Sequence, residues 1–396
     1  MRASDARFII SGAIALAVAM GVGRFAYTPI IPVMERDAGL GVAGAGALAT
    51  ANLLGYLVGA SLAMHPMVYR RRLAFTRWSL AGVVVTTALM AGPSPLWLAL
   101  RFMTGICSGL VFVFASSIVL ERAAKARAAT WAPLFFTGVG FGIAFSGVAV
   151  PWFATLGGSR ITWAGIAIVS AVALLVTGSW FGEDAAAKRT GEAVARAEPS
   201  PHRATFIWLS AVYTAEAFAY IIPATFLVAI ITKTPGLSHY AALSWVFVGL
   251  AAAFATFAWI PAGTHVGKSR ALAIALGVQA VGLAAPVFSP SAFAVIFCAV
   301  ALGGTFIAIA LFANGLGRDI YPRQTNTAVS RLTVLYSVGQ IIGPIVATQL
   351  ALRFGSYDPA LLAAAAIAAL ATIATLIAIR DPQPVHATIR GGESGI

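Results

Sequence analysis

Two ionisable residues stand inside long apolar stretches of this chain, and the residues beside them repeat. Arg24 precedes the string Phe25-Ala26-Tyr27, and Glu216 lies just before a second Phe-Ala-Tyr string that ends at Tyr220. The two strings are 193 residues apart, close to half of the 396-residue chain. A charged group among apolar residues is costly, so it marks a candidate site for binding ions or moving protons. The repeat predicts two related halves with buried groups of opposite charge.

The composition predicts an integral membrane protein. Apolar residues make up 60% of the chain and charged residues only 10%, whereas a soluble domain carries about 25% charged residues. A water-soluble fold has too little interior to bury this much apolar surface. Lipid must therefore surround most of the chain.

The apolar segments predict twelve membrane-spanning helices, since a helix needs about 20 residues to cross the hydrocarbon core. The predicted spans are residues 8–34, 45–65, 74–92, 95–120, 131–154, 161–181, 204–231, 239–262, 271–288, 292–315, 328–351 and 358–379. The longest polar gap, 182–203, predicts a cytoplasmic linker between an N-terminal six-helix bundle (1–181) and a C-terminal one (204–396). The expected fold class is thus an all-α integral membrane protein built from two pseudo-symmetric six-helix bundles.

The distribution of Lys and Arg predicts the orientation of these spans. If the N-terminus is inside, twenty of the 26 Lys and Arg residues fall on the inner side and only four on the outer side: Arg36, Arg160, Lys233 and Arg353. This bias predicts that both termini are cytoplasmic, in a bacterial-type cytoplasmic (inner) membrane. It also explains the net charge of +13 through contact with anionic lipid rather than with nucleic acid.

Three strings carry a resemblance to a known family. They are residues 21–29 in the first span, 220–227 in the seventh, and 332–333 with 336–344 in the eleventh. Together they resemble the YbfB/YjiJ family of the major facilitator superfamily, over essentially the whole chain. The resemblance implies a secondary transporter in which spans one, four, seven and ten line a central cavity, flanked by spans two, five, eight and eleven.

The fourth span adds a broader similarity to the superfamily, and two loops depart from it. Arg101-Phe-Met-Thr-Gly resembles an Arg-x-x-Gln-Gly element, with Thr104 in place of Gln. In some proton-coupled members that Arg takes part in coupling; a static packing role for Arg101 is the alternative. The loops after spans two and eight lack the Asp that is usual in the superfamily. The acidic contact that this Asp makes at a helix end is therefore in doubt here. The Gly-Pro motif of many drug antiporters is absent from the fifth span.

The candidate substrate or coupling residues follow from depth and helical spacing. Arg24 lies about 16 residues into the first span, and Tyr27 shares its face at i+3. In the seventh span Tyr213, Glu216 and Tyr220 form one polar stripe. Two alternatives remain open for the charges: Arg24 extends to the outer surface, or Arg24 and Glu216 form a fixed ion pair between the halves.

Secondary candidates lie on the flanking spans. Asn52 and Tyr56 share one face of the second span, and Tyr336 and Gln340 share one face of the eleventh. Polar contacts that simply hold helices together are the equal alternative. Gly-x-x-x-Gly pairs begin at Gly55, Gly105, Gly138 and Gly339. They predict either seams along which the halves slide or ordinary close packing.

Several kinds of chemistry are not indicated. The sequence has no phosphate-binding loop of the Gly-x-x-x-x-Gly-Lys-Ser/Thr type, no nucleophile–base set, and no metal-ligand spacing among its five His and two Cys residues. We therefore expect no enzyme, no nucleotide-driven pump, no cofactor and no metal.

The expected function is secondary transport of a small organic solute by alternating access. Two buried arginines against one glutamate favour an organic anion as the solute. Glu216 is the only carboxyl group deep in a span, and burial favours its protonated form, so protons are the expected coupling ion. Lipid is the other expected partner; no nucleic acid and no obligate protein partner are expected. A membrane sensor or scaffold that binds a ligand without moving it is the alternative function.

Overall fold

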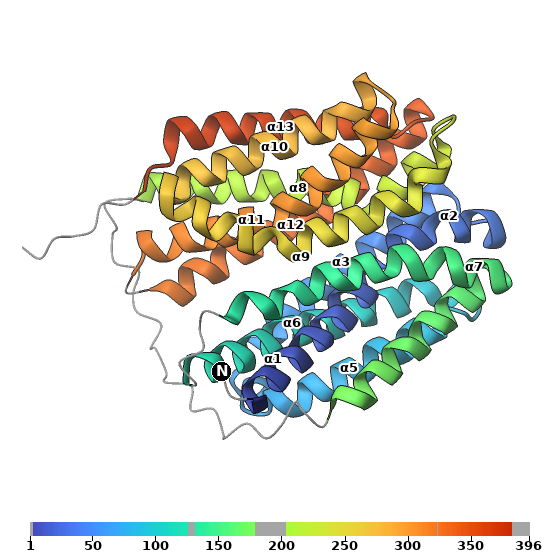
Figure 1. Ribbon diagram of the computed structural model, residues 1–396, viewed down its shortest axis with the longest axis horizontal. Helices are drawn as coiled ribbons and strands as arrows, with labels where there is room; N and C mark the ends of the chain where they lie inside the picture. The colour runs from blue at the N-terminus through green and yellow to red at the C-terminus, as the bar shows by residue number, and fades with distance from the viewer. Residues whose placement is uncertain (1–2, 126–130, 179–202, 323, 382–396) are drawn as a thin grey trace, which may run out of the picture.

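A computed structural model describes residues 3–125, 131–178, 203–322 and 324–381, and every regular element in these ranges is a helix (Figure 1). The first predicted span is divided into three parts. These are α1 (Ala3–Leu16), the π-helix η1 (Ala17–Phe25) and α2 (Tyr27–Ala38). The chain therefore changes its helical phase just before Tyr27, which sequence periodicity did not predict.

The rest of the N-terminal half follows the predicted spans closely. Its elements are α3 (Val42–Ala63), α4 (Pro66–Arg70), α5 (Arg72–Leu89), η2 (Ser94–Leu96), α6 (Trp97–Lys125) and α7 (Ala132–Thr177). The long helix α7 contains two predicted spans, because non-helical backbone at Gly157 and Gly158 breaks it. Gly158 has a φ of 65°, which favours glycine. The carboxylate of Asp37 accepts a hydrogen bond from the Ser159 amide at 3.0 Å and fixes the turn.

The C-terminal half supplies the other six spans. Its elements are α8 (Arg203–Lys233), η5 (Ser238–Tyr240), α9 (Ala241–Val266), α10 (Lys268–Phe288), α11 (Ala292–Ile320), α12 (Thr325–Phe354) and α13 (Asp358–Ala378). Among the described residues, ten helical segments are long and apolar enough to cross a membrane. Counting α7 as two spans and adding α5, which is not among the ten, gives the twelve predicted helices. Apart from Arg203, the predicted linker lies outside the described residues.

The helices form two bundles that lie side by side (Figure 1). In the N-terminal bundle α3 packs on α6 and α1 on α7, while in the C-terminal bundle α8 packs on α12 and α10 on both α11 and α13. The bundles meet mainly through three helix pairs, α7 with α9, α3 with α12 and α2 with α8, and α2 also contacts α9. These pairs form the interface that a site between the halves must use.

Glycine brings the two halves together along α7 and α9. A Cβ atom on Gly140 would lie 2.2 Å from the backbone nitrogen of Ala253, and one on Gly249 would lie 2.2 Å from that of Ala144. The two helices therefore touch backbone to backbone, as small residues permit in membranes.

The predicted Gly-x-x-x-Gly pairs do not form this contact. Each packs inside one half: Gly105 meets the Asn52 carbonyl of α3, for example, and Gly339 meets the Thr214 carbonyl of α8. Of the two alternatives for these pairs, the contacts fit ordinary close packing and not seams between the halves. Their spacing indicates close packing, but it contains no information on which helix is the partner.

The two ends of the molecule differ in how the halves join. We call the end where the chain begins the near end, and the end that carries the connection from α2 to α3 the far end. One apolar core runs through both halves toward the far end and includes Ile30 of α2 and Phe226 of α8. At the near end the C-terminal half has a separate core. In the N-terminal half Ala63, Leu110 and Phe114 form a small separate cluster, and the large core extends along α1 to Phe8 and Ile9. Lys233 and Glu35 add an ion pair between the halves at the far end, with 2.9 Å between nitrogen and oxygen.

Candidate functional site

Arg24 lies in the last turn of the π-helix. The Ala26 amide donates to the Gly21 carbonyl at 2.8 Å, a spacing of five residues. Such π segments are rare and occur frequently at functional sites. A close backbone contact accompanies this one, because a Cβ on Gly21 would lie 2.4 Å from the Cα of Gly142 in α7.

The Arg24 side chain crosses to the other half of the molecule. It is 7% exposed, and its Nη2 donates a hydrogen bond of 2.9 Å to the Tyr220 hydroxyl of α8. The guanidinium carbon lies 5.0 Å from the centre of the Tyr56 ring, a distance at which a cation is attracted to an aromatic face. Arg24 therefore lies between the halves and does not extend to the outer surface.

Tyr220 connects several candidate residues. Its oxygen accepts hydrogen bonds from Arg24 and from Gln340 Nε2 of α12. Its ring stacks on Phe306 and Tyr336, with centroid distances of 5.6 Å and 5.8 Å. Arg24 Nη2 and Gln340 Nε2 can donate hydrogen bonds but cannot accept them. The Tyr220 oxygen accepts both bonds, so the hydroxyl proton of Tyr220 is used in neither.

Arg101 points at the backbone of the π-helix. It is 2% exposed, and its Nη1 donates to the Gly23 carbonyl at 3.0 Å. Asn52 Nδ2 donates to the Arg101 carbonyl at 3.1 Å and, more weakly, to that of Gly23 at 3.4 Å. Carbonyl groups at the end of a helical segment need such partners. Arg101 and Asn52 therefore hold the turn that aims Arg24.

Tyr27 contributes to the same support. Its hydroxyl donates to the Ala45 carbonyl of α3 at 3.0 Å, and its ring lies 4.6 Å from the guanidinium carbon of Arg101. Tyr27 shares the Arg24 region, as its spacing predicts, but its hydroxyl is bound within the N-terminal half.

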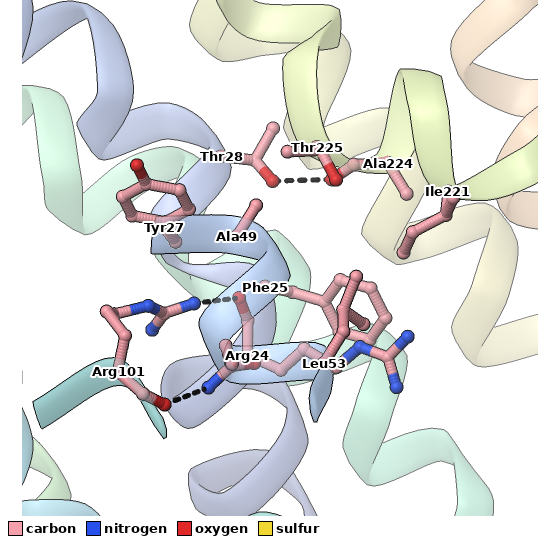
Figure 2. Close-up of a pocket in the computed structure, with 11 residues that line it drawn as sticks. Arg24, Phe25, Tyr27, Thr28, Ala49, Leu53, Arg101, Ile221, Ala224 and Thr225 are labelled. Atoms are coloured by element: carbon pink, nitrogen blue, oxygen red, sulfur yellow. Dashed lines mark hydrogen bonds between the residues drawn. The ribbon is translucent and has the colours of Figure 1, made fainter. Parts of the chain in front are cut away.

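These residues line a small cavity between the halves (Figure 2). Its walls include Arg24, Asn52 and Arg101 from one half and Ile221, Ala224 and Thr225 from the other. The cavity volume is about 20 Å³, which is room for about one water molecule. On its far side Thr28 donates to the Ala224 carbonyl at 2.5 Å. In this conformation the site is closed around its donors.

Glu216 lies apart from the cavity, inside the C-terminal half. Its side chain is fully buried, and the polar groups that face it are those of Tyr336 and of Gln279 in α10. Neither makes a hydrogen bond of accepted geometry, so both carboxyl oxygens lack a partner among the described residues. The fixed Arg24–Glu216 ion pair is absent from these contacts; Arg24 binds Tyr220 instead.

All nine predicted site residues fall in one continuous region. Arg24, Tyr27, Asn52 and Arg101 line the cavity; Tyr56 and Tyr220 contact Arg24; Gln340 and Tyr336 contact Tyr220; and Glu216 faces Tyr336. Sequence reasoning missed Gln279 of α10 and Thr305 of α11, which form a buried hydrogen bond of 2.9 Å. The pattern that marks Asn52 as a candidate, an amide side chain inside an apolar span, also marks Gln279.

The missing loop aspartates have acidic substitutes on other elements at the near end. Arg72, at the start of α5, pairs with Glu121 of α6 at 2.6 Å, and Lys268, at the start of α10, pairs with Asp319 of α11 at 2.5 Å. Asp381 accepts a hydrogen bond from the Ser269 amide at 3.0 Å. Each basic loop thus keeps an acidic partner at a neighbouring helix end.

Comparison with known proteins now identifies the family. Residues 16–376 match the sequence profile of a family described as uncharacterised MFS-type transporter YbfB. The chain belongs to this family.

Two solved transporters share the fold of this MFS-type chain. A crystal structure of a mutant of the nucleoside transporter NupG is similar with a TM-score of 0.72 and 12% identity, covering 94% of this chain and 100% of the other. The POT family transporter PepTSo gives a TM-score of 0.71 and 12% identity, covering 95% and 97%. At this identity the likeness shows the fold alone. No curated protein matches the chain in sequence.

Proposed function

We propose that this MFS-type protein is a proton-coupled secondary transporter that moves a small organic anion across the cytoplasmic (inner) membrane by alternating access. The near end then faces the cytoplasm and carries both termini, in accord with the positive-inside rule. One observation carries the proposal: the buried cation of Arg24 crosses between the halves, and its hydrogen-bond partner among the described residues is a neutral hydroxyl.

The cavity favours an anion because it presents hydrogen-bond donors. Nε of Arg24 and Nε of Arg101, two residues that line the cavity, lack acceptors among the described residues. Next to the cavity, the hydroxyl proton of Tyr220 is used in neither of its two hydrogen bonds. No carboxylate is among the residues that line the cavity. Carboxylate and phosphate oxygens accept from such groups, and guanidinium is well suited to them. A ligand that brings negative charge also offsets the cost of burying a cation without a counter-charge.

Alternating access requires the contacts at the far end to separate. Three links between the halves lie on this side: Arg24 to Tyr220, Thr28 to Ala224, and Lys233 to Glu35. The separate core of the C-terminal half at the near end favours an interface that opens there first. The glycine contact between α7 and α9 would act as the pivot for rocking of the halves.

Glu216 is the proposed proton site. A buried carboxyl group without a counter-charge is far less costly in its neutral form. Tyr220 lies within electrostatic range of both Arg24 and Glu216. An anion that binds at Arg24 and Tyr220 would add negative charge close to the Glu216 carboxyl. Anion binding would then favour a protonated Glu216, and anion and proton would move together.

Ligand binding tests the anion class. The purified protein would be screened by thermal shift against a panel of monocarboxylates, dicarboxylates, organic phosphates, and neutral and cationic compounds at two pH values. We expect anions to raise the melting temperature, and Arg24→Gln to weaken that binding about 10- to 100-fold, as loss of a hydrogen bond to a charged group would.

Arg353→Gln is the matched control, because it removes the same charge from the exposed surface of α12. Stabilisation by cations only, or equal binding by the Arg24 variant, would reject the anion proposal. A compound that stabilises the protein but does not accumulate in proteoliposomes would indicate the sensor or scaffold instead.

A further inference from the structure

One hydroxyl group near Glu216 has more acceptors than it can serve. Thr305 Oγ1 lies 2.6 Å from the Ala301 carbonyl and 2.9 Å from Gln279 Oε1. A threonine hydroxyl has a single proton to donate. If that proton goes to the Ala301 carbonyl, the stronger contact by distance, Thr305 Oγ1 can only accept from Gln279.

Gln279 can satisfy either arrangement by turning its side chain. A carboxamide has an acceptor oxygen at one end and a donor NH₂ at the other, and a half-turn exchanges the two. Gln279 is fully buried. Its Oε1 atom contacts Thr305, and its Nε2 atom has no hydrogen-bond partner among the residues that the structure describes. The same side chain faces the Glu216 carboxyl. The amide thus lies between a group that can change protonation and a hydroxyl that can reverse its hydrogen bond.

We propose that Gln279 is the positioning residue of the Glu216 carboxyl and that its amide turns over when Glu216 gains or loses a proton. With Glu216 ionised, Gln279 Nε2 donates to the carboxylate and Gln279 Oε1 accepts from Thr305. With Glu216 protonated, its O–H donates to Gln279 Oε1, Gln279 Nε2 donates to Thr305 Oγ1, and Thr305 donates to the Ala301 carbonyl. Each arrangement gives every hydroxyl and carboxyl proton one acceptor and uses one of the two Gln279 N–H groups, and no proton leaves the chain except that of Glu216.

The other polar groups around Glu216 are phenols, and Tyr336 faces the carboxyl together with Gln279. The titratable side chains that influence it or are influenced by it are Tyr213 and Tyr220 on its own helix and Tyr336 on α12. All three are phenols, and among the described residues no Lys, Arg or His hydrogen-bonds to the carboxyl. What distinguishes Gln279 is its hydrogen bond to Thr305, which connects the group facing Glu216 to the backbone of α11.

The test uses infrared difference spectroscopy of the purified full-length protein between low and high pH, and rests on the proposed proton site. The carbonyl band of a protonated carboxyl that disappears in Glu216→Gln belongs to Glu216. In Gln279→Leu we expect this band to move to the higher frequency of a carboxyl group without a hydrogen bond. We also expect it to persist to higher pH, because hydrogen bonds to ions are stronger than those to neutral groups. Thr305→Val should produce a smaller change in the same direction.

Gln324→Leu is the matched control, because Gln324 is another buried glutamine, at the start of α12, and is not one of the site residues. It should leave the frequency of the Glu216 band where it is in the wild type. A Glu216 band that is identical in wild type and Gln279→Leu, in protein whose melting temperature shows that it is folded, would overturn the role of Gln279 alone. A wild-type spectrum without any pH-dependent Glu216 band would overturn the proton site itself.

Discussion

The two Phe-Ala-Tyr strings are the same three residues in two different environments. Tyr27 binds a carbonyl of its own half, whereas Tyr220 binds Arg24 of the other half and Gln340. The first string lies at the end of a π-helix, while the second lies within the continuous α-helix α8. A π turn holds an extra residue and so rotates the residues after it about the helix axis. A sequence repeat therefore fixes which residues are equivalent along the chain, but helix phase decides which way they point.

The charges beside the strings differ in the same way. Arg24 has partners from both halves, through Tyr220 and the rings around it. Glu216 is enclosed by the C-terminal half and has no partner of hydrogen-bond geometry among the described residues. Under the proposed mechanism, the contact of Arg24 would separate when the halves open, whereas the site of Glu216 would move as part of one half.

Replacing Glu216 should produce the largest effect. In proteoliposomes with a pH-sensitive dye inside, Glu216→Gln should abolish proton movement driven by the anion, because glutamine cannot gain or lose a proton at this site. Asp358→Asn, which neutralises an exposed acid at the start of α13, should behave as wild type. Proton movement at the wild-type rate in the Glu216 variant would show that Glu216 is not the proton site and would contradict the different roles proposed for Glu216 and Arg24.

Removing the cause of the phase difference should cost stability. Gly21→Ala places a methyl group 2.4 Å from the Gly142 backbone, so we expect a loss of about 1–3 kcal/mol or more in the free energy of unfolding. Gly304→Ala is the same change where nothing lies within 4 Å, and it should be neutral or slightly stabilising. Thermal unfolding in detergent would measure both. Equal melting temperatures would show that the Gly21–Gly142 contact does not hold the π-helix.

The two tyrosines give the smallest and most specific effect. Tyr220→Phe should weaken anion binding about 10-fold through loss of a hydrogen bond to a charged ligand, whereas Tyr27→Phe should mainly lower stability, by about 1 kcal/mol. Isothermal titration calorimetry with the anion and thermal unfolding of both variants would distinguish weaker binding from lower stability. The reverse pattern would mean that the first string, not the second, faces the ligand.

Much of the fold could be predicted because its signals are local. Hydropathy located each span, and the turn at Gly157 and Gly158 falls between two of them. The candidate residues were found because a polar group inside an apolar span is conspicuous wherever it points. Gln279 met the same criterion and was passed over.

What the sequence could not supply depends on contacts between distant residues. The π-helix is held by Gly142 of α7 and by Arg101 of α6, and no pattern within residues 17–25 contains that information. The same holds for Glu216, whose direction is set by the packing of α8 against α10 and α12. Glycine spacing likewise revealed tight seams without their partners.

The backbone contact between Gly140 and Gly249 has a consequence for how motion is transmitted. Side chains at a moving interface must change rotamers, and each change adds a barrier and an ordering cost. Where two backbones touch directly, no rotamers have to change, so this contact can persist while the ends on either side open and close. The two halves would then pivot about a contact made of main-chain atoms alone. A single added methyl group at Gly140 or Gly249 would push α7 and α9 apart at the pivot itself.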